Sequence, residues 1–376
     1  MTMPIPNATA VAVVGEPLAA VDTPALLLDL DAFERNCDRL EQSLQGRSVA
    51  VRPHAKSHKC PEIARRQMRR GAVGICCQKV SEAAAFAEDG IDNILISNEV
   101  VGEKKIDQLI ALARRITISV CVDDHRNAHD IHTAAQSAGV VIPVLMELDV
   151  GAHRCGVAPG IPALQLAQAI RQMPGLKFAG LQAYHGPAQH MRSEREREAA
   201  IGEAIALTKS TRDLLLAHGI ACPVIAGAGT GGFLVEAASQ VYTELQVGSY
   251  IFMDVDYARN DWTHSRMPKF EHSLFVWTTV MSVRGDHHAV VDAGLKASSV
   301  DSGLPVVADR PDVIYTKASD EHGVLQVNGP PLALGDKLRL IPGHCDPTVN
   351  LYNELVVVQG DRVQAIWPIT ARGALR

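Results

Sequence analysis

The fold is decided by a strand–helix–strand pattern that reads NILIS at Asn93–Ser97, KKIDQLIALAR at Lys104–Arg114 and TISVCV at Thr117–Val122. The two outer stretches are short and rich in Ile, Leu and Val, as buried strands are. The middle stretch is longer, and its apolar residues recur three or four positions apart, as on one face of a helix. Because strands joined by a helix usually pair in parallel, the pattern predicts a parallel sheet covered by helices.

The same alternation extends from Val49 to Val247. We find eight short apolar runs, at Val49–Arg52, Val73–Cys76, Asn93–Ser97, Thr117–Val122, Ile142–Leu148, Phe178–Ala183, Pro223–Ala226 and Glu244–Val247. Helical patterns separate them, for example at Glu62–Arg70, Ser81–Ala87 and Ala199–His218. Eight strand–helix units close into a (β/α)₈ (TIM) barrel of the α/β class. An open, doubly wound sheet fits less well, because nothing marks the point where its strand order would reverse.

The two ends of the chain differ from this middle part. Ala25–Asp29 is a strand-like run, and Asp31 with Glu34 resembles a capping box at the start of a helix. After Pro268 the strand-like runs follow without helical patterns, at Leu274–Val283, His288–Val291, Val324–Val327, Lys337–Ile341 and Leu355–Val358. These runs predict a second, all-β domain of ordinary domain size. We therefore expect an N-terminal segment over residues 1–30, a barrel over 31–267 and a β domain over 268–376.

The overall composition excludes several classes of protein. With 47% hydrophobic and 21% charged residues, the chain is neither globally disordered nor fibrous. A net charge of −6 argues against a general nucleic-acid binder. No apolar run approaches the roughly 18 residues that a membrane-spanning helix needs, and Met1–Val21 lacks the basic start of a secretory signal. We therefore expect neither a nucleic-acid nor a membrane partner.

The cysteines give a further indication about the compartment. The eight Cys residues include no C-x-x-C pair, and several lie inside apolar, strand-like runs. Buried free thiols in a reducing cytoplasm explain this usage most simply, with a nucleophilic cysteine as the functional alternative. We therefore expect a cytoplasmic protein.

A group of basic residues follows the first barrel strand, in the stretch RPHAKSHKC at Arg52–Cys60. Barrel enzymes have their active sites at the C-terminal ends of the strands. A lysine there can form a Schiff base with an aldehyde, either a substrate or pyridoxal phosphate. Lys56 is the candidate in this loop. Lys59, Lys79 and Lys296 compete for the role, and a solvated basic loop is the structural alternative.

A glycine-rich stretch, AGAGTGG at Ala226–Gly232, follows the seventh barrel run. Its glycines allow backbone N–H groups to approach an anion closely. Gly248-Ser249-Tyr250 follows the eighth run, and barrel phosphate sites are often built from the loops after these two strands. The stretch therefore predicts a phosphate site, with a flexible turn as the alternative.

His344 and Asp346 stand two positions apart in GHCDP, after the apolar run Leu338–Ile341. On an extended chain both side chains would face one way, and Cys345 would face the other. One imidazole and one carboxylate suit Mn²⁺, Mg²⁺ or Co²⁺, with water or substrate completing the coordination. Such a pair also arises easily by chance.

Two further candidates lie after barrel runs. Arg154, after Ile142–Leu148, is suited to binding a carboxylate with two hydrogen bonds, and a solvated salt bridge is the alternative. Tyr184 and His185 follow Phe178–Ala183 and could contact a cofactor. A half-buried aromatic side chain with a polar tip is an equally ordinary role.

Taken together, these motifs identify a family resemblance. The sequence resembles the D-threonine aldolases and the 3-hydroxy-D-aspartate aldolases, within the alanine-racemase-like, fold-type III pyridoxal-phosphate enzymes. The similarity extends from about residue 20 to the C-terminus. The matching stretches are 22–24, 52–56, 74–83, 96–100, 154–157, 181–186, 242–246, 248–250, 292–296, 320–323 and 344–348.

The resemblance implies a role for each candidate residue. Lys56 matches the Schiff-base lysine, and Arg154 matches an arginine near the phenolic oxygen of the cofactor and the substrate carboxylate. His58 matches a histidine proposed as the base for the substrate hydroxyl. The segments that contact the cofactor match at Tyr184, Thr230, Gly231, Gly248, Ser249 and Tyr250, with Thr230, Gly231 and Tyr250 near the phosphate. His344 and Asp346 match the metal ligands.

The resemblance also bears on the glycine-rich loop and on the N-terminal strand. The chain has Ala228 where relatives often have glycine. In the family fold, the strand before the first barrel helix joins the β domain, so Ala25–Asp29 should pack with residues after about 268.

The expected activity is that of a carbon–carbon lyase that depends on pyridoxal phosphate and a divalent cation. It would cleave 3-hydroxy-D-amino acids to glycine and an aldehyde. The rival is a D-serine or 3-hydroxyaspartate dehydratase, but those relatives tend to have His-x-Cys where this chain has His344-x-Asp346. A racemase needs no metal pair, and a non-catalytic pyridoxal-phosphate carrier would lack the β domain.

Several points stay open at this level. The base is either His58 or a metal-bound water. A hydroxyaspartate substrate needs a cation for its second carboxylate, for which Arg259, His264 and Arg266 are candidates. The stretch Val300–Pro305 looks more like the hydroxyaspartate branch. We expect a homodimer that acts on a small amino acid.

Overall fold

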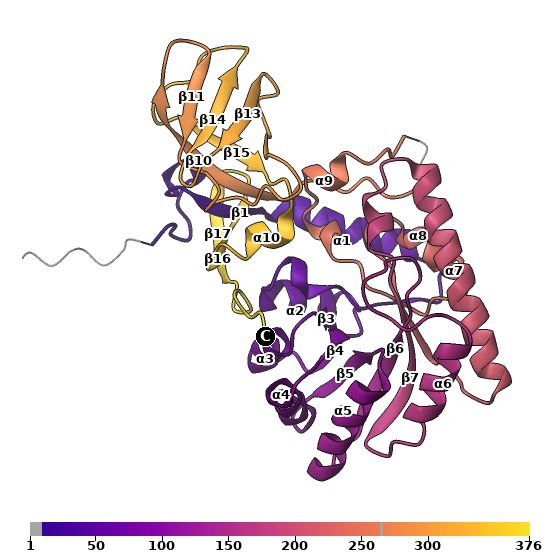
Figure 1. Ribbon diagram of the computed structural model, residues 1–376. Helices are drawn as coiled ribbons and strands as arrows, with labels where there is room; N and C mark the ends of the chain where they lie inside the picture. Colours follow the sequence, from indigo (N-terminus) through magenta and orange to yellow (C-terminus); the bar gives the residue numbers. More distant parts are fainter. Residues whose placement is uncertain (1–9, 264–265) are drawn as a thin grey trace, which may run out of the picture. The chain divides into compact units, whose positions relative to one another are not determined.

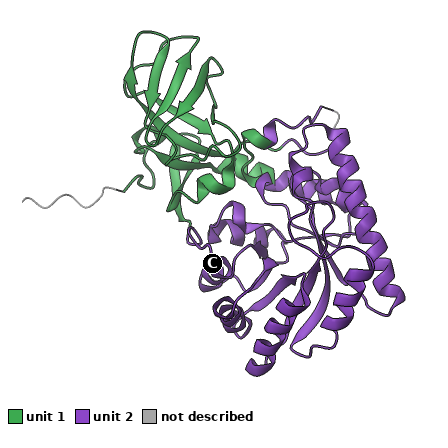
Figure 2. Cartoon of the chain, viewed as in Figure 1, with its two compact units in different colours: residues 1–36, 251–256, 270–369 green, residues 37–250, 257–269, 370–376 purple. Residues whose placement is uncertain are grey.

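A computed structural model describes residues 10–263 and 266–376, so part of Met1–Val21 and all of His264 lie outside the described residues. The chain divides into two compact units (Figure 2). The barrel unit comprises Cys37–Tyr250, Tyr257–Lys269 and Thr370–Arg376. The β unit comprises the segment that ends at Asn36, together with Ile251–Asp256 and Phe270–Ile369. The boundaries expected after residues 30 and 267 stay predictions of the domain limits.

Eight parallel strands form the sheet of the barrel unit (Figure 1). They are β2 (Ala50–Val51), β3 (Ile75–Cys77), β4 (Asn93–Glu99), β5 (Thr117–Val122), β6 (Ile142–Glu147), β7 (Leu176–Ala183), β8 (Val224–Gly227) and β9 (Glu244–Leu245). Hydrogen bonds connect them in the order β2-β9-β8-β7-β6-β5-β4-β3. A parallel bridge between His54 and Cys76 joins the two ends of that order. The predicted (β/α)₈ barrel is therefore confirmed.

The strand register places one layer of small and branched side chains together in the barrel core. Cys76, Leu95, Cys121, Leu145 and Ala226 form a single buried cluster. Cys76 pairs with Leu95, and Cys121 pairs with Leu145, across neighbouring strands. Two of the eight cysteines are thus packing residues of the core, as the sequence predicted.

Helices connect the strands of the barrel. They are α2 (Pro61–Arg69), α3 (Val80–Glu88), α4 (Glu103–Ala113), α5 (His125–Ala138), α6 (Ile161–Ile170), α7 (Glu194–Ala217) and α8 (Phe233–Ala238). The local signals at α5 explain its limits. The Asp124 side chain accepts a hydrogen bond from Arg126 N–H at its start, and Gly139 ends it with a left-handed φ of 69°. Ile131 and Ala135 are buried on its inner face.

The β unit contains a nine-stranded sheet in which the N-terminal strand is central. Its strands are β1 (Ala25–Asp29), β10 (Leu274–Val283), β11 (His288–Val291), β12 (Val306–Val307), β13 (Val313–Ala318), β14 (Gly323–Val327), β15 (Lys337–Ile341), β16 (Glu354–Gln359) and β17 (Arg362–Pro368). β1 pairs antiparallel with β10 and parallel with β16. The expectation that this strand joins the β domain is confirmed. β12, β13 and β17 were not predicted.

The start of α1 (Leu30–Leu44) corrects the predicted capping box. Asp31 already lies inside the first turn of the helix. The cap is Asp29, whose Oδ1 accepts a hydrogen bond from Ala32 N–H at 3.0 Å. The helix begins two residues earlier than a cap at Asp31 allows, because β1 ends at Asp29 and the chain turns there.

The remaining helical elements are short. They are η1 (Leu18–Ala20), η2 (Ala55–Ser57), η3 (Pro187–His190), η4 (Ser249–Ile251), α9 (Val255–Ala258) and α10 (Cys345–Val349). Among the described residues, no helix combines the length and the apolar character that crossing a membrane requires.

Candidate active site

The loop after β2 holds the candidate lysine in a fixed turn. Lys56 lies in η2, and its N–H donates to His54 Nδ1 at 3.4 Å. The other ring nitrogen of His54 is 2.7 Å from Gln78 Nε2. His54 also forms the bridge that closes the barrel. The half-buried Lys56 therefore belongs to a loop at the C-terminal end of a barrel strand, where its neighbour His54 ties the turn to the sheet.

Two of the competing lysines are held in ion pairs. Lys59 Nζ is 2.9 Å from Glu82 Oε1, and the Glu82 side chain is fully buried. Lys296 pairs with Glu321 on the exposed surface of the β unit. A lysine in an ion pair is charged and is a poor nucleophile. Lys59 and Lys296 are thus each held by a carboxylate, while Lys56 stays the candidate through the family resemblance, with Lys79 as a competitor.

His58 is completely buried next to the candidate lysine. Its Nδ1 accepts a hydrogen bond from Cys60 N–H at 3.1 Å, and its ring packs edge-on against Phe86, with 6.0 Å between the centroids. Because Nδ1 is an acceptor, the neutral ring carries its proton on Nε2. In this tautomer Nε2 can donate a hydrogen bond but cannot take up a proton.

The glycine-rich stretch fits an anion. A side chain at Gly229 would lie 2.6 Å from the Gln189 side chain, and one at Gly248 would lie 2.7 Å from Ser57 Oγ. Gln189 Oε1 accepts a hydrogen bond from Gly231 N–H at 2.8 Å and so fixes the loop. Thr230 is 1% exposed, and its hydroxyl has no hydrogen-bond partner among the described residues. A buried hydroxyl without a partner is costly, and a bound phosphate would remove this cost.

Ala228 has a backbone conformation that agrees with the expectation of glycine in relatives at this position. Its φ is 71°, in the left-handed region that glycine adopts with little strain. The alanine is fully buried in this conformation. The loop thus keeps its path without the glycine, and the departure from the family pattern does not disturb the candidate phosphate site.

The two candidate tyrosines differ in their surroundings. Tyr250 is buried in η4, and its hydroxyl accepts a hydrogen bond from Gln67 Nε2 at 3.0 Å. Burial holds the pKa of Tyr250 well above its usual value, so the phenol stays neutral. Tyr184 is half-buried after β7. Its ring lies close to Gly186, because a Cβ atom at Gly186 would be 3.2 Å from the ring. Contacts of either residue with a cofactor stay predictions.

Arg154 lies in an exposed part of the loop that follows β6. Asp149 Oδ1 accepts hydrogen bonds from Gly151 N–H and His153 N–H, each at 3.0 Å. His185, after β7, packs closely against this loop. A Cβ atom at Gly151 would lie only 2.8 Å from His185 Nε2. Arg154 forms no ion pair with any described residue, so its guanidinium is available for an anionic ligand.

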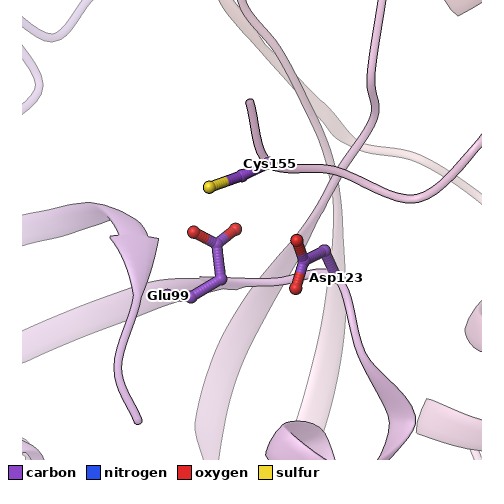
Figure 3. A group of neighbouring side chains, drawn as sticks. All are labelled: Glu99, Asp123 and Cys155. Carbon is purple, nitrogen blue, oxygen red and sulfur yellow. The ribbon is translucent and has the colours of Figure 1, made fainter. Parts of the chain in front are cut away.

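Sequence reasoning missed an acidic group at the ends of three successive strands. Glu99 ends β4, Asp123 follows β5 and Glu147 ends β6. The ligand atoms of Glu99, Asp123 and Cys155 all lie within 4.8 Å of one another, and their side chains point toward one another in Figure 3. Burial, with Glu99 beside it, raises the pKa of Glu147 to about 8. The signal in the sequence was an acidic residue at the C-terminal end of each of these strands.

The metal candidates lie at the start of α10, in the β unit. The expectation of an extended chain is wrong, because the helix begins at Cys345 and Asp346 lies in its first turn. Cys345 is buried: its N–H donates to Asp254 Oδ2 at 3.0 Å and its thiol donates to Met253 O at 3.2 Å. These two bonds to Met253 and Asp254 favour the helical turn.

Asp301 is a second residue that sequence reasoning missed. Its Oδ2 lies 2.8 Å from His344 Nδ1. Histidines that bind metals usually donate their other ring N–H to a carboxylate, which orients the ring and leaves Nε2 for the metal. The donor set of His344 and Asp346, with Asp301 behind the imidazole, therefore fits a divalent cation.

The structure gives little support to a nucleophilic cysteine or to the cationic side chains expected to bind a second substrate carboxylate. Burial raises the pKa of Cys60 to about 11, so its thiol stays protonated. All eight cysteines are free, and six of them are buried, while Cys155 and Cys222 are partly exposed. Arg259 and Arg266 are exposed, and His264 lies outside the described residues. Their role toward a second substrate carboxylate stays a prediction.

Comparison with known proteins places these features in a family. The model of the alanine racemase N-terminal domain matches residues 28–256, and that of the Putative serine dehydratase domain matches residues 273–358. A D-threonine aldolase from Arthrobacter sp is 50% identical over 364 residues, which cover 96% of this chain and 96% of that protein. The chain belongs to the D-threonine aldolase and 3-hydroxy-D-aspartate aldolase family.

Other relatives agree with this membership. A 3-hydroxy-D-aspartate aldolase from Paracoccus denitrificans is 46% identical and covers 94% of this chain and 92% of its own. The crystal structure of D-threonine aldolase from Filomicrobium marinum is 51% identical, covers 98% of this chain and 100% of its own, and superposes with a TM-score of 0.96. A D-threo-3-hydroxyaspartate dehydratase from Delftia sp. is more distant, at 29% identity over 88% of this chain and 92% of its own. The aldolase interpretation is thus favoured over the dehydratase.

Proposed function

We propose that this protein is an aldehyde-lyase that uses pyridoxal 5'-phosphate and a divalent cation. It cleaves 3-hydroxy-D-amino acids, such as D-threonine and 3-hydroxy-D-aspartate, to glycine and an aldehyde. The observation that carries the proposal is the glycine-rich loop with the buried, unpartnered hydroxyl of Thr230. It supplies an anion site in the same barrel that presents Lys56 after β2, and the family membership supplies the reaction class.

The barrel residues have separate tasks in this proposal. Lys56 binds the cofactor covalently, and the backbone around Thr230, Gly231, Gly248, Ser249 and Tyr250 holds its phosphate. When bound, the cofactor supplies an electron sink for cleavage of the Cα–Cβ bond. Arg154 binds the carboxylate of the amino acid and sets its orientation. Tyr184 packs beside the cofactor at the end of β7.

The proton of the β-hydroxyl must leave as the Cα–Cβ bond breaks. His344 and Asp346 hold a cation, which would supply a Lewis acid for that hydroxyl. His58 would act as the base only in the tautomer that gives up the hydrogen bond from Cys60 N–H. We therefore propose that His58 orients the substrate hydroxyl by a hydrogen bond from Nε2, and that the hydroxyl proton would leave to a water held by the cation.

The reaction products test the proposal. With D-threonine, the purified enzyme should form glycine and acetaldehyde; with 3-hydroxy-D-aspartate, it should form glycine and glyoxylate. A dehydratase would instead release ammonia and a 2-oxo acid, and a racemase would form the L-amino acid. Release of ammonia without glycine would refute the aldolase assignment. The ratio of the two cleavage rates identifies the preferred substrate. The same ratio, measured in the Arg259→Ala and Arg266→Ala variants, tests whether these arginines bind the second carboxylate of 3-hydroxy-D-aspartate.

Three finer points belong to the same proposal. We propose that the native cation is Mn²⁺, Mg²⁺ or Co²⁺, since an imidazole and carboxylate oxygens suit these metals. Metal analysis of the enzyme as purified identifies it. We also propose a homodimer and a cytoplasmic location. Light scattering during gel filtration measures the first, and fractionation of the producing cells measures the second.

A further inference from the structure

The loop that presents Arg154 is closed at its base by backbone hydrogen bonds. Val157 N–H donates to Glu147 O at 2.9 Å, and Asp149 N–H donates to Val157 O at 3.1 Å. Leu148 and Val157 form a parallel bridge. The chain therefore leaves the end of β6, carries Arg154 outward and returns to the place where it started.

Gly156 is the point at which this loop is fixed to the neighbouring strand. Its φ is 106°, and a side chain there would lie 2.4 Å from Asp149 N and 2.5 Å from Leu148 C. Only glycine fits this position. Its N–H donates to Asp123 Oδ2 at 2.9 Å. Because Asp123 directly follows β5, this hydrogen bond ties the Arg154 loop to a second strand.

The side chains of Glu99 and Cys155 also lie beside Asp123 (Figure 3). Burial, together with the nearby Asp123, raises the pKa of Glu99. Burial also raises the pKa of Cys155 to about 11. Asp123 Oδ2 already accepts the hydrogen bond from Gly156 N–H, so this carboxylate is engaged in holding the loop.

Among the described residues, no side-chain hydrogen bond or ion pair fixes the direction of Arg154, although its charge acts on nearby Glu147. Arg154 is exposed and forms no ion pair with another described residue. The neighbouring His153 is bound to Asp149, with 3.0 Å between Nδ1 and Oδ2. The direction of the guanidinium therefore depends on the backbone of residues 149–157, and that backbone depends on Gly156 and Asp123.

We propose that Asp123 is a positioning residue for Arg154. By accepting the hydrogen bond from Gly156 N–H, it holds the loop so that the guanidinium meets the substrate carboxylate. This role rests on the proposed function, in which Arg154 binds that carboxylate. Asp123 itself acts only through the loop and touches neither substrate nor cofactor.

A double-mutant cycle tests the proposal. Asp123→Ala should raise the KM for D-threonine by about 10-fold, with a smaller change in kcat and with unchanged absorbance of the lysine-bound cofactor. Asp123→Asn should keep most of the affinity, because its amide oxygen can still accept from Gly156 N–H. In an Arg154→Ala background, Asp123→Ala should add almost nothing, because its effect passes through Arg154. Asp130→Ala, an exposed acid on α5, is the matched control.

A second readout does not need activity. Trypsin cleaves after arginine, so cleavage at the Arg154–Cys155 bond reports how firmly the loop is held. Asp123→Ala should speed this cleavage relative to the wild type, while Asp123→Asn and Asp130→Ala should not. Additive effects of Asp123→Ala and Arg154→Ala on KM, or unchanged cleavage in Asp123→Ala, would overturn the proposal. Failure of the wild-type enzyme to form glycine would overturn the proposed function instead, and the trypsin result would still decide the role of Asp123.

Discussion

The barrel unit and the β unit hold their candidate residues in different ways. In the barrel, Lys56, Arg154 and Thr230 lie in loops after strands, and the parallel sheet determines where those loops are. In the β unit, His344 and Asp346 lie at the start of a five-residue helix. There the positions depend on single side chains, Asp301 for the imidazole and Asp254 for the turn.

This difference shows what each kind of site tolerates. A loop on a barrel strand can hold a residue such as Ala228 in a left-handed conformation, because the sheet still fixes both of its ends. A site that depends on individual hydrogen bonds loses its geometry when one partner is removed. We therefore expect substitutions to affect cofactor binding in the barrel and metal binding in the β unit separately.

The largest effect should come from Lys56. Lys56→Ala removes the amine that binds the cofactor covalently, so turnover should fall below detection and the absorbance of the lysine-bound cofactor should disappear. Absorbance spectra and treatment with borohydride check this result. If the variant still holds a cofactor that borohydride links to the chain, the lysine assignment is wrong, and Lys79 becomes the candidate. Lys59→Met, which breaks the buried pair with Glu82, should instead lower stability.

The next effect concerns the phosphate site of the barrel. Thr230→Val removes the buried hydroxyl but keeps the shape of the side chain. Because a hydrogen bond to a charged group contributes about 1.5–3 kcal/mol, the affinity for pyridoxal phosphate should fall by about 10-fold or more, with metal affinity unchanged. Titration of the apoenzyme with the cofactor measures this affinity, and Thr230→Ser is the matched control that restores the hydroxyl. Equal affinities of Thr230→Val and the wild type would show that the hydroxyl does not face the phosphate.

A further effect concerns metal affinity in the β unit. Asp301→Asn keeps the size of the side chain but weakens its hold on His344 Nδ1. The loss of such an outer partner typically lowers metal affinity by about 10–100-fold. The variant should therefore need more Mn²⁺ for half-maximal activity, and excess metal should restore much of the rate. A normal metal titration in Asp301→Asn would contradict the assigned role of Asp301.

The smallest effect is on stability, through a buried carboxyl of the barrel unit. Glu236, in α8, is 2% exposed, and burial raises its pKa to about 8. Its folded pKa is above the unfolded value of about 4.3. The folded state therefore favours the protonated form, and its contribution to stability is lost as pH rises through about 8.

The Glu236→Gln variant tests this pH dependence. Between about pH 6 and about pH 9, the free energy of unfolding of the wild type should fall by ~1 kcal/mol or more relative to this variant. Urea unfolding at several pH values measures the difference, and Glu203→Gln, an exposed position on α7, serves as the control. Parallel pH curves for wild type and Glu236→Gln would show that Glu236 is ionised in the folded state.

The sequence was sufficient for the main architecture because the signals are repeated along the chain. Each of the eight apolar runs corresponds to a barrel strand, and the C-terminal end of a strand is where Lys56, Arg154 and Thr230 were expected. The pairing of β1 with β10 and β16 followed from the family resemblance and not from the residues of Ala25–Asp29 themselves.

The remaining features depend on contacts that no local pattern records. Asp29 caps α1 in place of Asp31 because the preceding strand ends there. The turn at Cys345 forms because Asp254, far away in the sequence, accepts its N–H. Likewise, Glu99, Asp123 and Cys155 meet only through the register of β4, β5 and β6. β12 is two residues long, too short to show an alternating pattern.

The most direct test of the account is whether cleavage of D-threonine needs the cation. Glycine formation should be measured with the native enzyme, with enzyme shown to be metal-free after chelation, and after Mn²⁺, Mg²⁺ or Co²⁺ is added back. We predict that chelation lowers the rate by orders of magnitude, since a Lewis acid at the hydroxyl contributes several kcal/mol and each ~1.4 kcal/mol is about tenfold. His344→Ala and Asp346→Ala should retain the cofactor and behave like the chelated enzyme. Full cleavage by metal-free enzyme would contradict the account.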